Sequence, residues 1–353
     1  MENTTLFTPL RIGEIEMPNR IVMAPMTRSR ADDAGIPGGL SKEYYAQRAS
    51  AGLIITEATY VSAMAKGYVR TPGISNDAQE EAWSKIAEAV HARGGKIFMQ
   101  LFHTGRIALP DFLPRNAAPV APSAIAALGQ NYTDDGMKSF VTPRELETEE
   151  IPYIIAEFAK ATERALRAGF DGVELHAASG YLVHQFMMSS SNRRTDMYGG
   201  LFDNRIRFLM ETLDAMSGVK GAGHVGVKLS PQMPYNDIQE EDAEDFYPYV
   251  MKSLSARGLA YVHVAKSNEI DWHSKLRQNY IGRYFAGGKL TKHTGEALIE
   301  QGRSDAAVFG SLFLANPDLP TRFSTDAPLN TPDPETFYSP GPKGYTDYPT
   351  LEL

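Results

Sequence analysis

The stretch that follows one apolar run carries three side chains able to donate hydrogen bonds: His176, Ser179 and Tyr181. Because His176 directly follows Gly172–Leu175, we expect it and Ser179 to leave one turn toward one point. Two donors that converge on a carbonyl oxygen stabilise an enolate-like transition state. A phenol, with a pKa of about 10, stays protonated at neutral pH and can deliver a proton to carbon. The pattern indicates acid-assisted carbonyl chemistry. Two plainer interpretations stay open, in which His176 ties down its own loop and Tyr181 is a packed aromatic.

The other residues at the ends of the apolar runs supply many hydrogen-bond donors and few carboxylates. They are Ala24-Pro25-Met26-Thr27, Glu57-Ala58-Thr59, Gln100, His103, Lys228, Gly287-Gly288 and Gly310-Ser311. Glycoside hydrolysis needs two opposed carboxylic acids, which this set does not provide. It suits an electron-rich planar ligand, or a carbonyl that needs polarising. The two glycine turns suit phosphate binding through backbone N–H groups, or are ordinary turns.

Eight short apolar runs alternate with amphipathic helical stretches along the chain. The runs are Arg20–Met26, Gly52–Ala58, Lys96–Phe102, Gly172–Ala177, Val225–Leu229, Ala260–Ala265, Gly282–Ala286 and Ala306–Gly310. Most are continuously apolar, as expected for parallel strands covered on both faces. Trp83, Ile86, Ala87 and Val90 form one helical stripe, and a second runs from Ile154 to Ala165. This order predicts an α/β fold, a single (β/α)8 TIM barrel, with a doubly wound open sheet as its competitor.

Two segments are longer than simple strand-to-helix loops. Thr104–Glu147 contains several prolines and is interpreted as a long excursion after the third strand. The tail from Ser324 is rich in proline and tyrosine, and we expect it to pack over the barrel. No repeat or charge block marks a second domain, so we treat residues 1–353 as one domain.

Composition limits the partners of the chain. Its 353 residues are 42% hydrophobic and 22% charged, with a formal net charge of −8 and no cysteine. The acidic balance gives no electrostatic reason to bind nucleic acid or an anionic membrane, and thiolate metal sites are excluded. We expect no metal, because His176 and His184 lack an acidic neighbour at zinc-ligand spacing. The polar start and the lack of a ~20-residue apolar run predict a cytoplasmic protein without a membrane span.

Gly221-Ala222-Gly223-His224-Val225-Gly226 matches the dinucleotide-binding fingerprint G-x-G-x-x-G. That fingerprint must follow a strand and open a helix. Here it follows a helical stretch and leads into an apolar run, so we interpret it as a helix-to-strand turn.

Several longer motifs resemble the old yellow enzyme family of flavin-dependent ene-reductases, above all its bacterial members that act on maleimides, nitrate esters and morphinones. The motifs run from Leu6-Phe7-Thr8-Pro9-Leu10 and Asn19-Arg20-Ile21-Val22-Met23-Ala24-Pro25-Met26-Thr27-Arg28 through Gln100-Leu101-Phe102-His103-Thr104-Gly105-Arg106 and Ser191-Asn192-Arg193-Arg194-Thr195-Asp196 to Ala315-Asn316-Pro317-Asp318-Leu319 and Gly344-Tyr345-Thr346-Asp347-Tyr348-Pro349. The likeness covers nearly the whole chain.

The resemblance implies a barrel that binds FMN non-covalently and is reduced by NAD(P)H. Flavin N5 would then give hydride to an α,β-unsaturated carbonyl or nitro compound, while a tyrosine supplies the proton. His176 and Ser179 match the positions that hold the carbonyl oxygen, and Tyr181 matches the proton donor. Tyr68 and Tyr345 would border the substrate. The flavin positions would be Ala24, Pro25, Met26, Thr27, Ala58, Gln100, Lys228, Gly287, Gly288, Gly310 and Ser311.

Three positions depart from the family pattern. Ser179 stands where His or Asn is usual, Lys228 replaces an arginine beside the flavin, and Ser311 replaces the basic residue of the phosphate turn. Lysine keeps the positive charge and loses the fork geometry of arginine. These departures keep open an alternative, a flavin-poor homologue that catalyses acid/base isomerisation or cyclisation. In either case the partners expected are small molecules, and the chain is expected to be a monomer or a small homo-oligomer.

Overall fold

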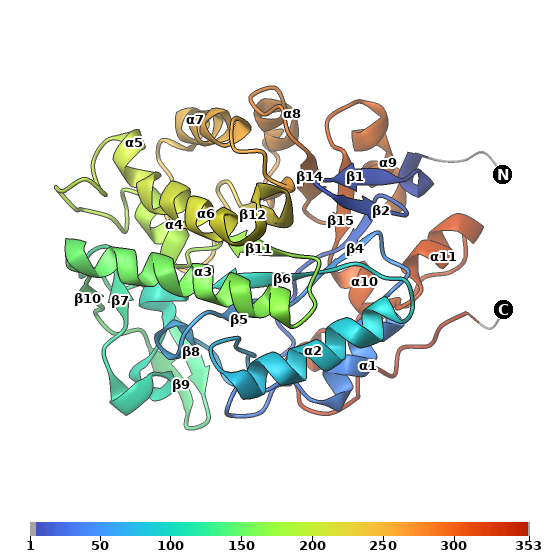
Figure 1. The fold of residues 1–353 in the computed structure, drawn as a ribbon, viewed down its shortest axis with the longest axis horizontal. Helices are drawn as coiled ribbons and strands as arrows, with labels where there is room; N and C mark the ends of the chain where they lie inside the picture. The colour runs from blue at the N-terminus through green and yellow to red at the C-terminus, as the bar shows by residue number, and fades with distance from the viewer. Residues whose placement is uncertain (1–4, 352–353) are drawn as a thin grey trace.

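A closed barrel of parallel strands, surrounded by helices, forms the centre of the molecule (Figure 1). This computed structural model describes residues 5–351. The barrel strands, in chain order, are β3 (Ile21–Met23), β4 (Leu53–Ile55), β6 (Ile97–Phe102), β11 (Gly172–His176), β12 (Val225–Leu229), β13 (Tyr261–Ala265), β14 (Tyr284–Gly287) and β15 (Ala306–Phe309). Each strand pairs with the next, and β15 pairs with β3 to close the sheet. The (β/α)8 barrel is confirmed, and the open doubly wound sheet is wrong.

The helices begin and end where the sequence provides caps and breaks. The Asn76 side chain accepts a hydrogen bond from the Gln79 N–H at the start of α2 (Asp77–His91), and Gly94 (φ 76°) follows its end. The other helices around the barrel are α1 (Gly39–Gln47), α3 (Ile151–Arg167), α4 (Leu182–Met187), α5 (Phe202–Arg205), α6 (Arg207–Lys220), α7 (Ala243–Ser255), α8 (Trp272–Arg277), α9 (Lys292–Glu300), α10 (Ser311–Ala315) and α11 (Leu319–Thr325). Both predicted stripes, in α2 and α3, are buried.

The G-x-G-x-x-G match is a helix-to-strand turn, as expected. Gly221 ends α6, a single 3-10 turn covers Ala222–His224, and β12 begins at Val225. No helix starts after these glycines, so their backbone N–H groups do not form the phosphate cradle of a dinucleotide site.

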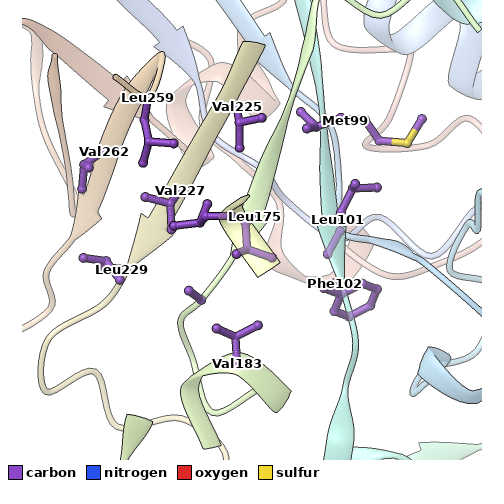
Figure 2. Close-up of a cluster of buried hydrophobic side chains, with 14 of the residues drawn as sticks. Met99, Leu101, Phe102, Leu175, Val183, Val225, Val227, Leu229, Leu259 and Val262 are labelled. Atoms are coloured by element: carbon purple, nitrogen blue, oxygen red, sulfur yellow. The ribbon is translucent and has the colours of Figure 1, made fainter. Parts of the chain in front are cut away.

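Side chains alternate between the two faces of each barrel strand. Figure 2 shows the packing outside the barrel, where Val225, Val227 and Leu229 of β12 lie beside Leu175 of β11 and near Val183 of α4. A separate apolar cluster fills the interior. Its members from the barrel strands include Val22, Leu53, Ile55, Phe98, Tyr261, Phe285 and Val308.

A hairpin closes the amino-terminal end of the barrel. Its strands are β1 (Leu10–Ile12) and β2 (Ile15–Met17), and their buried side chains join the interior cluster. In Figure 1 this hairpin lies to the right, and α4, which follows the carboxyl end of β11, lies to the left. The interior is therefore sealed with apolar side chains at one end, and only the carboxyl ends of the strands are left to form a site.

The long excursion after β6 is confirmed and contains short elements of its own. Three single-turn 3-10 helices lead to β7 (Val120–Ala121), which pairs with β10 (Arg144–Glu145). Between them, β8 (Gln130–Thr133) and β9 (Gly136–Ser139) form an antiparallel hairpin. A further short strand, β5 (Thr59–Tyr60), extends the sheet beside β6.

Three arginines from the first part of the chain hold the carboxyl-terminal tail. Arg28 donates to carbonyl oxygens of residues 337 and 344, and Arg30 to those of 336, 337, 341 and 343. Arg48, fully buried, donates to the carbonyl oxygens of residues 345, 313 and 314. The tail packs against the carboxyl-terminal end of the first barrel strand, as the sequence predicted.

Glu57, directly after β4, joins this tail anchor to the barrel. Its Oε2 accepts the backbone N–H of Arg28 at 3.1 Å, and its Oε1 accepts the hydroxyl of Tyr45 at 3.4 Å. Its side chain is almost wholly buried. Burial raises the pKa of Glu57 from 4.5 to about 7, against the opposing effect of the Arg28 N–H and the two nearby guanidiniums.

A carboxyl whose pKa is higher in the folded chain than in the unfolded chain destabilises the fold as the pH rises. For Glu57 the loss accumulates from about pH 4.5 to about pH 7, and at about 1.4 kcal/mol per pKa unit it amounts to roughly 3 kcal/mol. We expect Glu57→Gln, which cannot ionise, to flatten this part of the stability profile. Urea unfolding midpoints at pH 5 and pH 8 measure it. Parallel losses in the variant and the unchanged protein would contradict the assignment.

Candidate active site

The inner wall of the barrel becomes polar toward the carboxyl ends of the strands. The parallel register pairs Glu174 of β11 with Gln100 of β6. It also pairs Lys228 of β12 with His176 on one side and His263 of β13 on the other. These residues occupy alternate, inward-facing positions of their strands. The strand register thus brings five polar side chains that are far apart in the sequence into the carboxyl-terminal part of the barrel interior.

A buried carboxylate organises this layer. Gln100 Nε2 donates to Glu174 Oε1 at 2.6 Å, and His263 Nδ1 lies 3.1 Å from Glu174 Oε2. Since Gln100 donates an amide N–H to Glu174, its side-chain oxygen stays available as an acceptor. Glu174 and His263 were missed from the sequence. A glutamate within a fully buried strand was the available signal, because such a group needs partners.

Lys228 adds a positive charge at the same level. Its side chain is half-buried, and burial lowers its pKa, with Glu174 acting in the opposite direction. Within residues 5–351, the structure contains no hydrogen bond or ion pair from the Lys228 ammonium. An ammonium without a fixed partner at the barrel mouth fits an electron-rich or anionic ligand.

His176, Tyr181 and Tyr68 form one cluster at the end of β11. The rings of His176 and Tyr181 meet edge to face with centroids 4.8 Å apart, and Phe102 packs against both. The hydroxyls of Tyr68 and Tyr181 lie 3.0 Å apart. His176 Nδ1 is buried and has no hydrogen-bond partner among the residues that the structure describes. An unpaired buried donor or acceptor of this kind is costly unless a ligand satisfies it.

The protonation states suit acid chemistry. Burial lowers the pKa of His176 well below 6.5, with Lys228 adding to the effect, so the imidazole is neutral at pH 7. Burial raises the pKa of Tyr181, while hydrogen bonds from Tyr68 and Asn236 oppose the rise. Tyr181 therefore carries its proton at neutral pH. Asn236, in the loop after β12, was not found from the sequence, because nothing in its surroundings marks it.

Ser179 lies between His176 and Tyr181 in the chain and has an unusual backbone conformation. Its φ is 55°, in the left-handed region that Asn, Asp and His tolerate better than Ser. Its Oγ lies 4.0 Å from the Met233 sulfur, a weak contact that leaves the hydroxyl free to rotate toward a ligand.

Tyr345 lies in the tail anchor, and its expected place beside the substrate stays a prediction. The side chain is fully buried and stacks on Tyr44 with ring centroids 4.2 Å apart. The guanidiniums of Arg28 and Arg30 lie over its ring at 5.0 and 4.4 Å. The structure does not join Tyr345 to the cluster of His176 and Tyr181, because the tail anchor holds it.

The residues after β3 and β15 lie together at the mouth. Residues 24–27 are half-buried although β3 itself is fully buried, whereas Ala58, after β4, stays buried. A side chain built on Gly310 would meet Met26 and Ala24 at 3.7 and 3.9 Å, so these segments face one another with room between them. Ser311, at the start of α10, is exposed.

The other glycine turn has a structural reason of its own. Gly288 has a φ of 118°, and a Cβ there would lie 2.3 Å from the carbonyl oxygen of Lys266. Gly287 is buried, and its Cβ would lie 3.0 Å from His263 Nε2. Close packing alone therefore requires glycine at residue 288, whether or not a phosphate binds there. A glycine at residue 288 is therefore not by itself a sign of a phosphate site.

The residues present fit a flavin mononucleotide. The mouth offers the free acceptor of Gln100, the unpaired ammonium of Lys228 and the half-buried segment 24–27 for a planar polar ring. The backbone at Gly310 leaves space beside that segment, which suits an attached phosphate chain.

The described residues form neither a metal site nor a membrane-spanning helix. Across residues 5–351 no three His, Asp or Glu side chains are arranged to hold a metal ion. No helix in the same part of the chain is both long and apolar enough to cross a bilayer.

Sequence comparisons identify close relatives. Residues 5–330 match the NADH:flavin oxidoreductase / NADH oxidase family. The chain is 42% identical over 359 residues to 12-oxophytodienoate reductase 1 of Oryza sativa subsp. japonica, covering 98% of this chain and 93% of the relative. It is 40% identical over 365 residues to 12-oxophytodienoate reductase 2 of Arabidopsis thaliana, covering 99% and 97%.

Solved structures agree with these relatives. Morphinone reductase in complex with tetrahydroNAD superposes with a TM-score of 0.95 at 46% identity, covering 99% of this chain and 98% of that one. The old yellow enzyme homologue from Zymomonas mobilis also gives a TM-score of 0.95, at 40% identity, covering 98% and 100%.

The barrel has a mouth rich in hydrogen-bond donors, where a neutral histidine lies beside a protonated tyrosine, and the chain matches its relatives along nearly its whole length. The chain therefore belongs to the NADH:flavin oxidoreductase / NADH oxidase family, and it is an FMN-dependent ene-reductase of the old yellow enzyme type that uses NAD(P)H.

Proposed function

We propose that His176 and Ser179 bind the carbonyl or nitro oxygen of an activated alkene and that Tyr181 protonates its α-carbon. The observation that carries this proposal is the contact of the Tyr181 phenol with the neutral His176 imidazole, whose Nδ1 lacks a partner. When bound, FMN supplies the hydride, which it has taken from NAD(P)H. The chain supplies the remaining groups: donors for the oxygen and a proton for the carbon.

The proton donor is supported from behind. Either hydroxyl of the Tyr68–Tyr181 pair can donate. When Tyr68 donates, the proton of Tyr181 is free to point toward a substrate, and the phenolate left after transfer keeps the Tyr68 hydrogen bond. Asn236 acts in the same direction on the pKa of Tyr181. Two neighbours thus stabilise the charge that Tyr181 acquires.

The flavin would be held by the groups at the mouth. Gln100 and Lys228 offer hydrogen bonds and charge to the ring, with Ala24, Pro25, Met26, Thr27 and Ala58 lining it. Gly287, Gly288, Gly310 and Ser311 would lie near the phosphate. With Ser311 in place of a basic residue, backbone N–H groups would provide most of the phosphate contacts.

Cyclic enones are the substrate class that we favour. The relatives carry the names 12-oxophytodienoate reductase and morphinone reductase. We further propose that the chain acts as one domain, in the cytoplasm, as a monomer or small homo-oligomer, with no nucleic acid partner.

Purified protein tests the function directly. We expect it to bind FMN, turn yellow, bleach with NADH or NADPH, and regain its colour when 2-cyclohexenone, a maleimide or a nitroalkene is added. Protein that stays colourless in excess FMN, yet converts an enone without a reductant, would support isomerisation or cyclisation instead.

Tyr181→Phe separates the two half-reactions. Removing the phenol removes the proton donor, a change worth ~10²–10⁴ in rate for general acids. We expect the enone step to slow by about that factor while flavin reduction by NAD(P)H changes little. Stopped-flow absorbance at the flavin band measures both. Tyr132→Phe, on the exposed β8–β9 hairpin, is the matched control. Equal slowing of both steps would remove Tyr181 from the donor role.

Ser311→Arg tests the phosphate turn. One charge-assisted contact is worth ~1.5–3 kcal/mol, so we expect FMN to bind about 10- to 100-fold more tightly. Fluorescence titration of the apoprotein with FMN gives the dissociation constant. Ser324→Arg adds the same charge on an exposed position of α11 and controls for long-range attraction. An unchanged constant in Ser311→Arg would place the phosphate elsewhere.

A further inference from the structure

The turn that links His176 to Tyr181 is held by side chains at every backbone polar group of its two central residues. The N–H of Ser179 donates to Ser230 Oγ at 2.9 Å, and its carbonyl accepts from Asn236 Nδ2 at 2.6 Å. The N–H of Gly180 donates to His184 Nδ1 at 3.0 Å, and its carbonyl accepts from Gln185 Nε2 at 2.7 Å. Neither residue leaves a main-chain group free to pair differently.

Among these side chains, His184 has further polar side chains beside its second ring nitrogen. Because Nδ1 accepts the Gly180 N–H, a neutral His184 carries its proton on Nε2. Nε2 lies 3.0 Å from the Tyr247 hydroxyl and 3.2 Å from Glu240 Oε1. The other oxygen of Glu240 accepts the Gln232 N–H at 2.7 Å. The His184 and Tyr247 side chains are fully buried, and that of Glu240 nearly so.

We propose that His184 is a positioning residue for the proton-transfer step: Tyr247 pairs with its Nε2, the Glu240 carboxyl lies beside that nitrogen without a hydrogen bond of its own, and its Nδ1 holds the turn that carries Ser179 and Tyr181. The proposal rests on the roles given above to Ser179 and Tyr181. None of the three supporting groups touches the cluster of His176, Tyr181 and Tyr68 through a hydrogen bond among the described residues.

The turn needs such support because its backbone is strained. Ser179 and Gly180 follow each other with φ values of 55° and 76°. A left-handed serine costs free energy that the surroundings must offset. Residue 180 must be glycine, since a Cβ there would lie 2.6 Å from Asn236 Cβ. A turn released from His184 would shift toward a commoner conformation and carry the Tyr181 phenol with it.

Such a shift affects one half-reaction more than the other. A misplacement of about 1 Å can cost ~10²-fold in rate when the displaced group takes part in the chemistry. Tyr181 takes part in protonating the alkene and not in taking hydride from NAD(P)H. A residue with only a general structural role would affect both half-reactions, or flavin binding, together.

The tautomer is tested on the unchanged protein. Histidine labelled with ¹⁵N reports which ring nitrogen carries the proton, in the apoprotein and without any turnover. We expect the His184 signal to show a protonated Nε2 and a bare Nδ1 at pH 7. A protonated Nδ1 would contradict the proposal, because it could not accept the Gly180 N–H.

Paired variants test the consequence. His184→Leu removes the acceptor, and His184→Asn returns one, since the Asn side-chain oxygen reaches about as far as Nδ1. We expect His184→Leu to slow alkene-dependent reoxidation by ~10- to 100-fold and to speed hydrogen exchange of the Gly180 amide. Flavin reduction and the FMN dissociation constant should stay within about twofold, and Asn should recover most of the lost rate.

Two further variants keep the test decisive. His224→Leu removes another buried histidine, at the amino-terminal end of β12, where Nδ1 contacts the Asp171 carbonyl, and should leave both half-reactions unchanged. Glu240→Gln keeps the size of the side chain and removes its charge. If His184→Leu does not fold, Glu240→Gln should still slow reoxidation selectively and shift the Nε2 proton signal.

Equal rates for His184→Leu and His184→Asn, or parallel slowing of both half-reactions, would overturn the proposal, as would an unchanged reoxidation rate in Glu240→Gln. If the unchanged protein reduces no alkene at all, the proposed function fails instead, and the tautomer and Gly180 exchange can still be measured.

Discussion

The carboxylate of Glu174, wholly buried inside a closed parallel barrel, is the constraint on which the mouth of this molecule depends. A carboxyl group in such a place needs partners, and its two oxygens take Gln100 from the neighbouring strand β6 and His263 from β13, two strands away on the other side. The interior below is apolar and closed by the β1–β2 hairpin, so polar chemistry is confined to one end. Lys228, at the same end of the barrel, has no hydrogen bond or ion pair within residues 5–351, and Glu174 acts against the lowering of its pKa by burial.

The barrel could be predicted from the sequence because its strands are short, continuously apolar and regularly spaced. Val225–Leu229 matches β12 residue for residue. Elsewhere the apolar runs extend a residue or more beyond the hydrogen-bonded strand, as at Arg20–Met26, of which only Ile21–Met23 pairs. After β3 the extra residues 24–26 are half-buried at the mouth, whereas at β6, β13 and β14 the excess lies at the amino-terminal end of the strand, so the excess length by itself does not mark the site.

The site residues that lie close together in the sequence could be predicted, and those that the fold brings together from distant segments could not. His176, Ser179 and Tyr181 lie within a single turn, and the structure brings Tyr68 to them. Asn236, Glu240 and Ser230 come from the loop after β12, and no local pattern announces them. For Tyr345 the motif did not reveal the surroundings of the side chain. Its motif matches the family, yet the arginines that anchor the tail hold its ring in a buried stack. A motif names a residue and leaves its contacts undetermined.

In residues 176–181, the main-chain groups that hold the turn have hydrogen-bond partners, and the side-chain groups that would meet a substrate have few. Behind the turn, every main-chain group of Ser179 and Gly180 is paired, at the expense of two left-handed residues in succession. In front of it, His176 Nδ1 has no partner within the described chain, and the Tyr181 hydroxyl lies beside Tyr68 and Asn236, which can donate to it. Stability alone would favour hydrogen-bond partners for His176 and Tyr181 as complete as those of the Ser179 and Gly180 main chain. A turn that is fully hydrogen-bonded from behind is rigid before its ligand binds, so the free-energy cost of ordering it is met during folding. The groups without partners are then available to the substrate oxygen and to the carbon that is protonated.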